Sequence, residues 1–179
     1  MNRRTLVKQM IWMGAGIAFL PSCVYKQDKL SIQLRNFQIN PDQEKLLFAL
    51  ANTIIPATDT PGAADLGAHL FALKMVDDCL EQPAREKFTE GLKAFQQQSA
   101  TQLGKSFADA DQKARSGFLE MAVKKEPDSA MASFLQEFKR LVTRGYTQSE
   151  YVMTKLLPYK LVPGKYKSCI PFSELTQKS

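Results

Sequence analysis

The chain has 179 residues, of which 44% are hydrophobic and 9% are aromatic, and its formal net charge is +6. This length suits one domain, and the composition favours a folded domain over a disordered chain. Three positive charges, Arg3, Arg4 and Lys8, lie at the N-terminus, so the rest of the chain carries a net charge of +3. Because the remaining lysines and arginines are dispersed, the sequence argues against a nucleic-acid-binding protein.

The first 22 residues have the pattern of an export signal. The paired residues Arg3 and Arg4 precede an apolar run over residues 10–20, which small residues follow. A helix that spans a bilayer needs about 20 apolar residues, so this shorter run behind a basic segment predicts a cleaved signal peptide. The stretch NRRTLVK also resembles the twin-arginine signal, which implies export of folded cargo by the twin-arginine machinery.

The predicted signal ends in LPSC, which resembles the lipobox of exported lipoproteins. This resemblance implies that cleavage leaves Cys23 as a lipidated N-terminal residue. The alternative is that Cys23 only ends a hydrophobic segment. We expect a periplasmic lipoprotein with a membrane anchor, in which residues 23–38 form a tether before the folded domain.

Residues 39–179 are expected to form a single compact helical domain. The stretch Asn40–Pro41–Asp42 is typical of a helix start, because asparagine caps helices, proline favours the first turn and an acid suits the N-terminal dipole. Apolar residues at helical spacing continue to Ile55, and Pro56 ends this first helix. After the loop PATDTPGAAD, further helices are predicted over about residues 64–81 and 83–103.

The second half of the domain repeats this pattern. Asp109 or Asp111 is the expected cap of a fourth helix, and a fifth is predicted from the regular spacing of apolar residues 134–142, with Gly145 as its C-terminal cap. A short sixth helix spans about residues 149–156, and the chain after Pro158 should form an irregular strap. Since no segment alternates like a strand, the predicted class is all-α with about five or six helices.

Two cysteines remain once Cys23 is assigned to lipid. In an oxidising compartment the pair Cys79 and Cys169 predicts a disulfide that ties a helix in the middle of the chain to the C-terminal strap. The alternative is two unpaired thiols.

No catalytic motif accompanies these helices. The sequence has one histidine, His69, which by itself cannot complete a histidine-rich metal site and is more often a packed or surface residue. The neighbours Asp77 and Asp78 point about 100° apart on a helix, so they do not converge on one metal ion. Since the motifs for covalent haem, dinucleotides and nucleophilic serine are also missing, we expect no cofactor, no metal site and no enzyme activity of this chain's own.

Three stretches resemble one family: LANTIIPATDTPGAADLGAHLFALKMVDDC (residues 50–79), RLVTRGYTQSE (140–150) and YKLVPGKYKSCIPF (159–172). Together with the export signal, they are similar to the gluconate 2-dehydrogenase subunit 3 family. The sequence GYTQSE stands where the family commonly has an aromatic residue and then TSE. The resemblance implies a small subunit without a cofactor, in a membrane-associated sugar or sugar-acid dehydrogenase.

The family also implies the partners. A large subunit carries FAD and oxidises the substrate, and a cytochrome c subunit with haem commonly takes the electrons. The small subunit binds the large one and assists its export, assembly or stability. Two alternatives from other classes are a free-standing periplasmic lipoprotein with another partner and an enzyme in its own right.

The expected contact surface combines the loop after the first helix with the tyrosine-bearing C-terminal strap, because prolines and aromatic residues make rigid contacts that lose little entropy. The alternative is that both segments only cap the core. The candidate residues are Thr58, Asp59, Thr60, Pro61, Gly62, Tyr146, Tyr159, Pro163, Gly164 and Tyr166.

The export prediction can be tested on the paired arginines. Changing Arg3 and Arg4 to lysine should leave the protein in the cytoplasm with its signal uncut, because the twin-arginine machinery reads both side chains. Cell fractionation and the mass of the N-terminal peptide measure this result. Normal export of the double variant through the route for unfolded proteins would contradict the twin-arginine interpretation.

Overall fold

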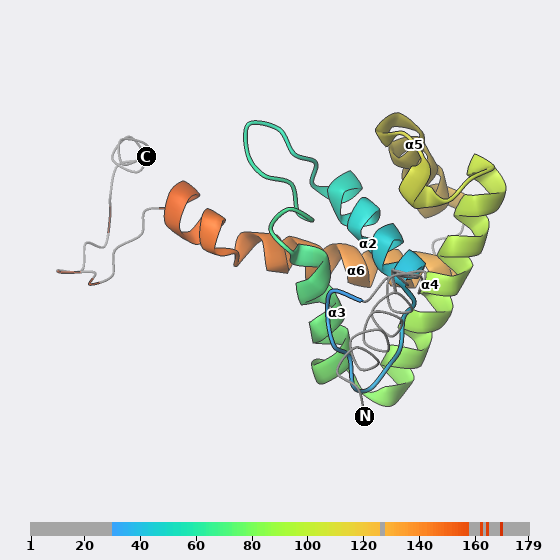
Figure 1. Cartoon of the computed structure of the whole chain (residues 1–179), viewed down its shortest axis with the longest axis horizontal. Coiled ribbons are helices and arrows are strands. Elements are labelled where there is room, and N and C mark those ends of the chain that lie inside the picture. The colour runs from blue at the N-terminus through green and yellow to red at the C-terminus, as the bar shows by residue number, and fades with distance from the viewer. Residues whose placement is uncertain (1–29, 126–127, 158–161, 163, 165–168, 170–179) are drawn as a thin grey trace, which may run out of the picture.

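The computed structural model describes residues 30–125 and 128–157, together with residues 162, 164 and 169 (Figure 1). The secondary structure of these residues is entirely helical, as predicted. The elements are α2 (Pro41–Ile54), α3 (Ala68–Cys79), α4 (Gln82–Leu103), the 3₁₀ turn η1 (Phe107–Asp109), α5 (Gln112–Lys125), α6 (Ala130–Thr147) and the π-helical segment η2 (Val152–Leu156). Among these helices, none is both long enough and apolar enough to cross a membrane.

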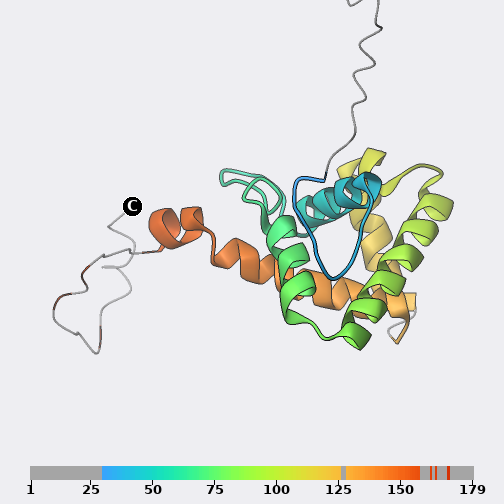
Figure 2. The same cartoon turned by 60° about the horizontal axis from the view of Figure 1, so that its bottom comes forward.

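Helix α6 runs through the molecule, and both α3 and α4 pack along it (Figures 1 and 2). Helix α2 contacts α3 on one side and η1 with α5 on the other. At its C-terminal end, α6 passes α3, and η2 continues beyond the other helices (Figures 1 and 2). The helices therefore form one packed body from which the last described helical segment protrudes.

The predicted start of the first helix is confirmed in detail. The Asn40 side chain accepts a hydrogen bond from the Gln43 backbone N–H at 2.8 Å, and the Gln43 side chain accepts one from the Asn40 N–H at 3.0 Å. This reciprocal pair satisfies two backbone donors that the first turn would otherwise leave open. Pro41 occupies the first turn, and the helix ends two residues before Pro56, as the sequence predicts.

The core is built largely from phenylalanine rings. The residues that set the helical periodicity of the third, fourth and fifth predicted helices include Phe88, Phe95, Phe118, Phe134 and Phe138, and all are buried. Phe88 meets Phe134 edge to face with centroids 4.9 Å apart, Phe95 meets Phe118 in the same way at 5.5 Å, and Phe138 stacks on Phe134 at 5.8 Å. Such geometry is favourable beyond the area buried, so the predicted helix faces converge on one core.

Two helix boundaries differ from the prediction. Helix α3 begins at Ala68 rather than near residue 64, because residues 63–67 form a turn that ends at Gly67 with φ of 69°. Gly145 does not cap the fifth predicted helix, since α6 continues to Thr147. A Cβ at Gly145 would lie 2.7 Å from Phe71 Cδ1, so this glycine lets α3 approach α6 instead of ending the helix.

Residues 30–38, expected to belong to the tether, lie on the folded body. Leu30, Ile32, Leu34 and Phe37 pack against the core. The Ser31 backbone N–H donates to the buried Glu44 carboxylate, at 2.9 Å from Oε2 and 3.2 Å from Oε1. We call residues 30–39 the N-terminal strap; Figure 2 shows it crossing the helical body. The signal at 1–22 and residues 23–29 lie outside the described residues.

The close approach of α4 and α6 depends on Gly91. A Cβ at this position would overlap Phe134 Cβ and would lie 2.5 Å from the Ala130 carbonyl oxygen. Both neighbours belong to the first turns of α6, so the two helices would have to separate. A side chain at Gly91 is therefore incompatible with the observed packing.

We predict that Gly91→Ala lowers the free energy of unfolding by about 1–3 kcal/mol, the usual cost of overpacking. Gly117→Ala is the matched control, because Gly117 lies inside α5 and an added Cβ would have no neighbour within 4 Å. That change should stabilise the protein by about 0.5–1 kcal/mol through backbone entropy alone. Urea denaturation followed by circular dichroism measures both values, and equal effects would contradict the proposed role of Gly91.

Candidate functional site

The loop that follows α2 has a defined conformation. The Ala63 N–H donates to the Ile55 carbonyl at 2.9 Å and closes the loop at its base, while the Thr58 N–H donates to the Thr60 carbonyl at 2.9 Å near its tip. We call residues 56–62 the proline loop. Thr58 and Asp59 at the tip are exposed, and Thr60 and Pro61 are half-buried. The backbone hydrogen bonds therefore hold the loop closed, with the polar side chains of Thr58 and Asp59 exposed at its tip.

Two side chains fix the end of the proline loop, where the chain turns back toward α3. The Asp65 carboxylate accepts from the Gly62 N–H at 2.9 Å, and the Asn52 side-chain oxygen accepts from the Ala64 N–H at 3.0 Å. Gly62 is buried between them, and a Cβ there would lie 2.7 Å from Asn52 Oδ1 and 2.9 Å from the Ala57 nitrogen. Only glycine fits this crowded turn, which explains its place in the loop.

Two predicted contact residues that are 86 positions apart meet in the structure. Thr60 Oγ1 of the proline loop lies 3.5 Å from the Tyr146 hydroxyl of α6, and either group can donate. Both side chains are half-buried. The proline loop and the C-terminal end of α6 thus form one continuous surface, which we call the loop–α6 face.

Of the predicted contact residues that follow Tyr146, the structure describes Gly164 alone. Gly164 is described, is exposed and has φ of 71°, a value that favours glycine. The rest of the predicted strap residues lie outside the described residues, as do the paired arginines and the lipidation site: Tyr159, Pro163, Tyr166, Arg3, Arg4 and Cys23.

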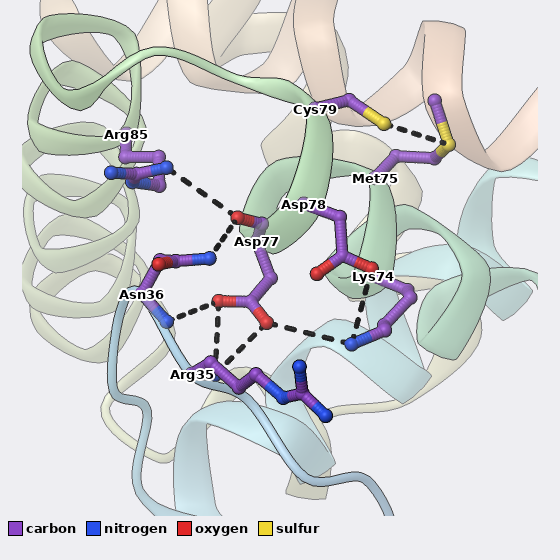
Figure 3. Close-up of polar contacts among 8 residues, drawn as sticks. All are labelled: Arg35, Asn36, Lys74, Met75, Asp77, Asp78, Cys79 and Arg85. Carbon is purple, nitrogen blue, oxygen red and sulfur yellow. Dashed lines mark hydrogen bonds and ion pairs between the residues drawn. The ribbon is translucent and has the colours of Figure 1, made fainter.

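The predicted disulfide is not formed in the structure. Cys79 and Cys169 are both free and exposed, and the Cys79 sulfur lies 3.9 Å from the sulfur of Met75 instead (Figure 3). A disulfide needs Cα atoms within about 7 Å. Cys79 ends α3, whereas α6 and η2 carry the chain away from that end of α3 (Figures 1 and 2).

Asp77, one of the two adjacent aspartates, is fully buried and holds the N-terminal strap (Figure 3). Its carboxylate accepts the Arg35 N–H at 2.9 and 3.1 Å and the Asn36 N–H at 2.6 Å. The Asn36 side chain donates to the Asp77 carbonyl at 2.8 Å, and Lys74 Nζ lies 3.6 Å from the carboxylate. Among the described residues, the exposed Asp78 pairs with Lys74 alone, at 3.2 Å.

These donors set the charge of Asp77. Burial by itself raises the pKa of the Asp77 carboxyl. The backbone N–H groups of residues 35–37 and the Lys74 ammonium together outweigh burial and hold the pKa below the usual value of an aspartate. The carboxylate is therefore ionised at neutral pH and occupied by donors from this chain. Within the described residues, no group of three or more histidine, cysteine or acidic residues could hold a metal ion.

His69 is a packed residue near the start of α3. It is 5% exposed, and its ring meets Phe48 edge to face with centroids 5.1 Å apart. Burial lowers the pKa of His69, while the Glu44 carboxylate opposes this shift. Its buried Nδ1 has no hydrogen-bond partner among the described residues. Because burial is the larger effect on its pKa, His69 is neutral at pH 7, and it belongs to the packing of α2 and α3.

A family model described as gluconate 2-dehydrogenase subunit 3 matches residues 41–164, more than half of the chain. The chain belongs to the gluconate 2-dehydrogenase subunit 3 family. Comparisons with curated proteins and with solved structures give no match.

The match to subunit 3 runs from the first residue of α2 to Gly164. It includes the proline loop, Asp77 and Tyr146, and it leaves out the N-terminal strap. The sequence predicts contact roles for Thr60 and Tyr146 but not the role of Asp77, because the strap donors are backbone groups that no side-chain pattern reveals. The signal that could have found it is an aspartate on the apolar face of a predicted helix.

We predict that Asp77→Asn lowers the free energy of unfolding by about 1.5–3 kcal/mol, because an amide cannot accept all the hydrogen bonds of the carboxylate. The matched control is Asp78→Asn, which removes only an exposed ion pair and should cost about 0–1 kcal/mol. Chemical denaturation at pH 7 compares the two, and hydrogen exchange should locate the loss of protection at residues 35–37. Equal effects of both substitutions would contradict the role of Asp77.

The same site predicts a pH dependence. Folding lowers the pKa of Asp77 below its value of about 3.9 in the unfolded chain. The contribution of Asp77 to the free energy of unfolding is therefore fully present above about pH 3.9, and it is lost as the pH falls through the lower pKa of the folded state. The stability difference between wild type and Asp77→Asn should therefore be constant near neutral pH and shrink in acid below that value. A constant difference down to pH 2 would contradict this linkage.

Proposed function

We propose that this chain is a non-catalytic small subunit of a periplasmic, membrane-associated, FAD-dependent dehydrogenase that acts on a sugar or sugar acid. In this proposal it assists the export, assembly or stability of the flavoprotein subunit. FAD belongs to that partner, and haem belongs to a third, cytochrome c subunit. The twin-arginine machinery and a lipid on Cys23 would bring the complex to the membrane.

The observation that carries the proposal is the family match over residues 41–164. The family is one of dehydrogenase subunits, so the chain is expected to work in a complex. The loop–α6 face offers a candidate contact surface, because Thr58 and Asp59 are exposed on a closed loop that touches Tyr146. A rigid surface loses little entropy when a partner binds, which favours stable association.

The predicted export signal gives this role a physical rationale. A flavoprotein that binds its cofactor before export must cross the membrane folded. A small subunit with a twin-arginine signal can carry such a partner when the two bind before export. The proposal therefore requires that the complex form in the cytoplasm.

Deletion of the gene tests this function. We expect the flavoprotein subunit to remain in the cytoplasm or to be degraded, and dye-linked sugar or sugar-acid dehydrogenase activity to disappear from the membrane fraction. Complementation with the wild-type gene should restore both. The measurements are immunoblots of cell fractions and reduction of an artificial electron acceptor by membranes.

Two results would argue against the proposal. Export of an active flavoprotein without this chain would contradict the accessory role, and a free-standing periplasmic lipoprotein would then be the better interpretation. Dehydrogenase turnover by the purified chain alone would instead indicate an enzyme in its own right.

A further inference from the structure

Exposed apolar side chains gather where the described chain leaves the body. We call residues 149–157 the C-terminal arm. Among the described residues, the large hydrophobic side chains that are exposed are Phe48, Met121, Met153, Leu156, Leu157 and Val162. Three of these six lie on the arm at 45–49% exposure, and Val162 follows at 79%. Isolated exposed hydrophobic residues are ordinary, but a cluster marks an interaction site.

The arm has regular hydrogen bonding. The Leu157 N–H donates to the Val152 carbonyl at 3.0 Å, which closes the π-helical turn. Val152 is buried, whereas Met153 and Leu156 of the same turn are exposed. The apolar groups are therefore held outward on a formed helical segment, and π-helical turns are frequent at functional sites.

The arm is joined directly to the loop–α6 face. The Ser149 hydroxyl donates to the Tyr146 carbonyl at 2.7 Å, and the Val152 N–H donates to the Ser149 hydroxyl oxygen at 3.4 Å. Tyr146 is also the residue whose hydroxyl meets Thr60. One partner can thus contact the proline loop and the arm together.

The charge of the same region indicates the kind of partner. Lys139, Arg140 and Arg144 on α6 and Lys155 on the arm are exposed, whereas the acidic residues of this stretch are Glu137 and Glu150. Residues 137–157 therefore carry a net charge of +2. The arm itself carries one exposed acid, Glu150, and one exposed base, Lys155, and Arg140 of α6 is paired with Glu137. The excess of positive charge therefore lies beside the arm on α6, at Lys139 and Arg144, where an acidic rim around an apolar groove would be complementary.

We propose that the C-terminal arm inserts into an apolar groove with an acidic rim on the flavoprotein subunit, next to the contact made by the proline loop. This inference rests on the proposed function and adds the surface that supplies the binding energy. Met153, Leu156 and Leu157 are the anchors, and the basic residues orient the arm. A partner protein fits better than a bilayer, because the arm is continuous with the polar loop–α6 face and the chain belongs to a family of subunits.

The test uses the full-length tagged chain, purified from membranes of its own host. The flavoprotein that copurifies is identified by peptide mass spectrometry and by the absorbance of its FAD. We expect the double substitution Leu156→Asp with Leu157→Asp to reduce its recovery at least about tenfold, as for central interface anchors. Met121→Asp is the matched control, since Met121 is equally apolar and exposed on α5, and recovery should stay within about twofold of wild type.

Three further measurements separate binding from folding, identify the contact and test the role of charge. All variants should melt at the wild-type temperature, because the substituted side chains are exposed. A benzophenone amino acid at position 156 should crosslink to the flavoprotein, and the same group at position 121 should not. Lys155→Glu should lower the amount of flavoprotein that copurifies with the tagged chain. It should also make this amount depend less on the salt concentration of the buffer, because an attractive charge has been replaced by a repulsive one.

The possible failures are distinguishable. If wild type retains the flavoprotein and the arm variant retains it equally, the arm inference is overturned and the proposed function stands. If wild type captures no flavin-dependent dehydrogenase, the proposed function fails first. Crosslinking from position 156 to a second copy of the chain overturns the inference. So does binding of the purified chain to vesicles of phosphatidylcholine and phosphatidylglycerol that depends on Leu156 and Leu157, without crosslinking to the flavoprotein.

Discussion

The packing of two helices against α6 is the constraint on which the rest of the structure depends. Each contact requires a glycine. Gly91 of α4 meets the start of α6 at Ala130 and Phe134, and Gly145 near the end of α6 receives the ring of Phe71 from α3. Because both contacts are close, α3 and α4 have fixed positions along one helix. That arrangement sets where the proline loop returns toward α6.

The sequence predicts a helix best where its start and its buried face are both local features. Helix α2 was predicted because Asn40, Pro41 and Asp42 lie together in the chain, and α6 because its apolar residues repeat regularly. Gly145 misled the prediction of a helix end, because a glycine in the last turn is also what a close neighbour requires. Sequence spacing cannot distinguish these two causes when the neighbour, Phe71, is far away in the chain.

The functional surface was predictable only in part, for the same reason. The proline loop was recognisable from its composition and Tyr146 from the tyrosine-rich C-terminal region, but their contact depends on how α3 and α6 pack. The N-terminal strap alternates apolar and polar residues only from Leu30 to Leu34, which is too short to predict a strand. Its place on the body follows from this apolar packing together with the hydrogen bonds that its backbone makes to Glu44 and Asp77. The sequence predicted the C-terminal arm only as a short helix. It could not show that the apolar side chains of this helix are exposed, because exposure depends on how the folded chain packs.

The two carboxylates that hold the strap also have a mechanical meaning. Glu44 grips the strap at Ser31 and Asp77 grips it at residues 35 and 36, and these acids belong to different helices, α2 and α3. A pulling force applied to the chain before residue 30 would load these short charge-assisted bonds before it reached Asn40 and the first turn of α2. The strap therefore distributes a pulling force over α2 and α3, and the Asn40 cap at the start of α2 bears less of it.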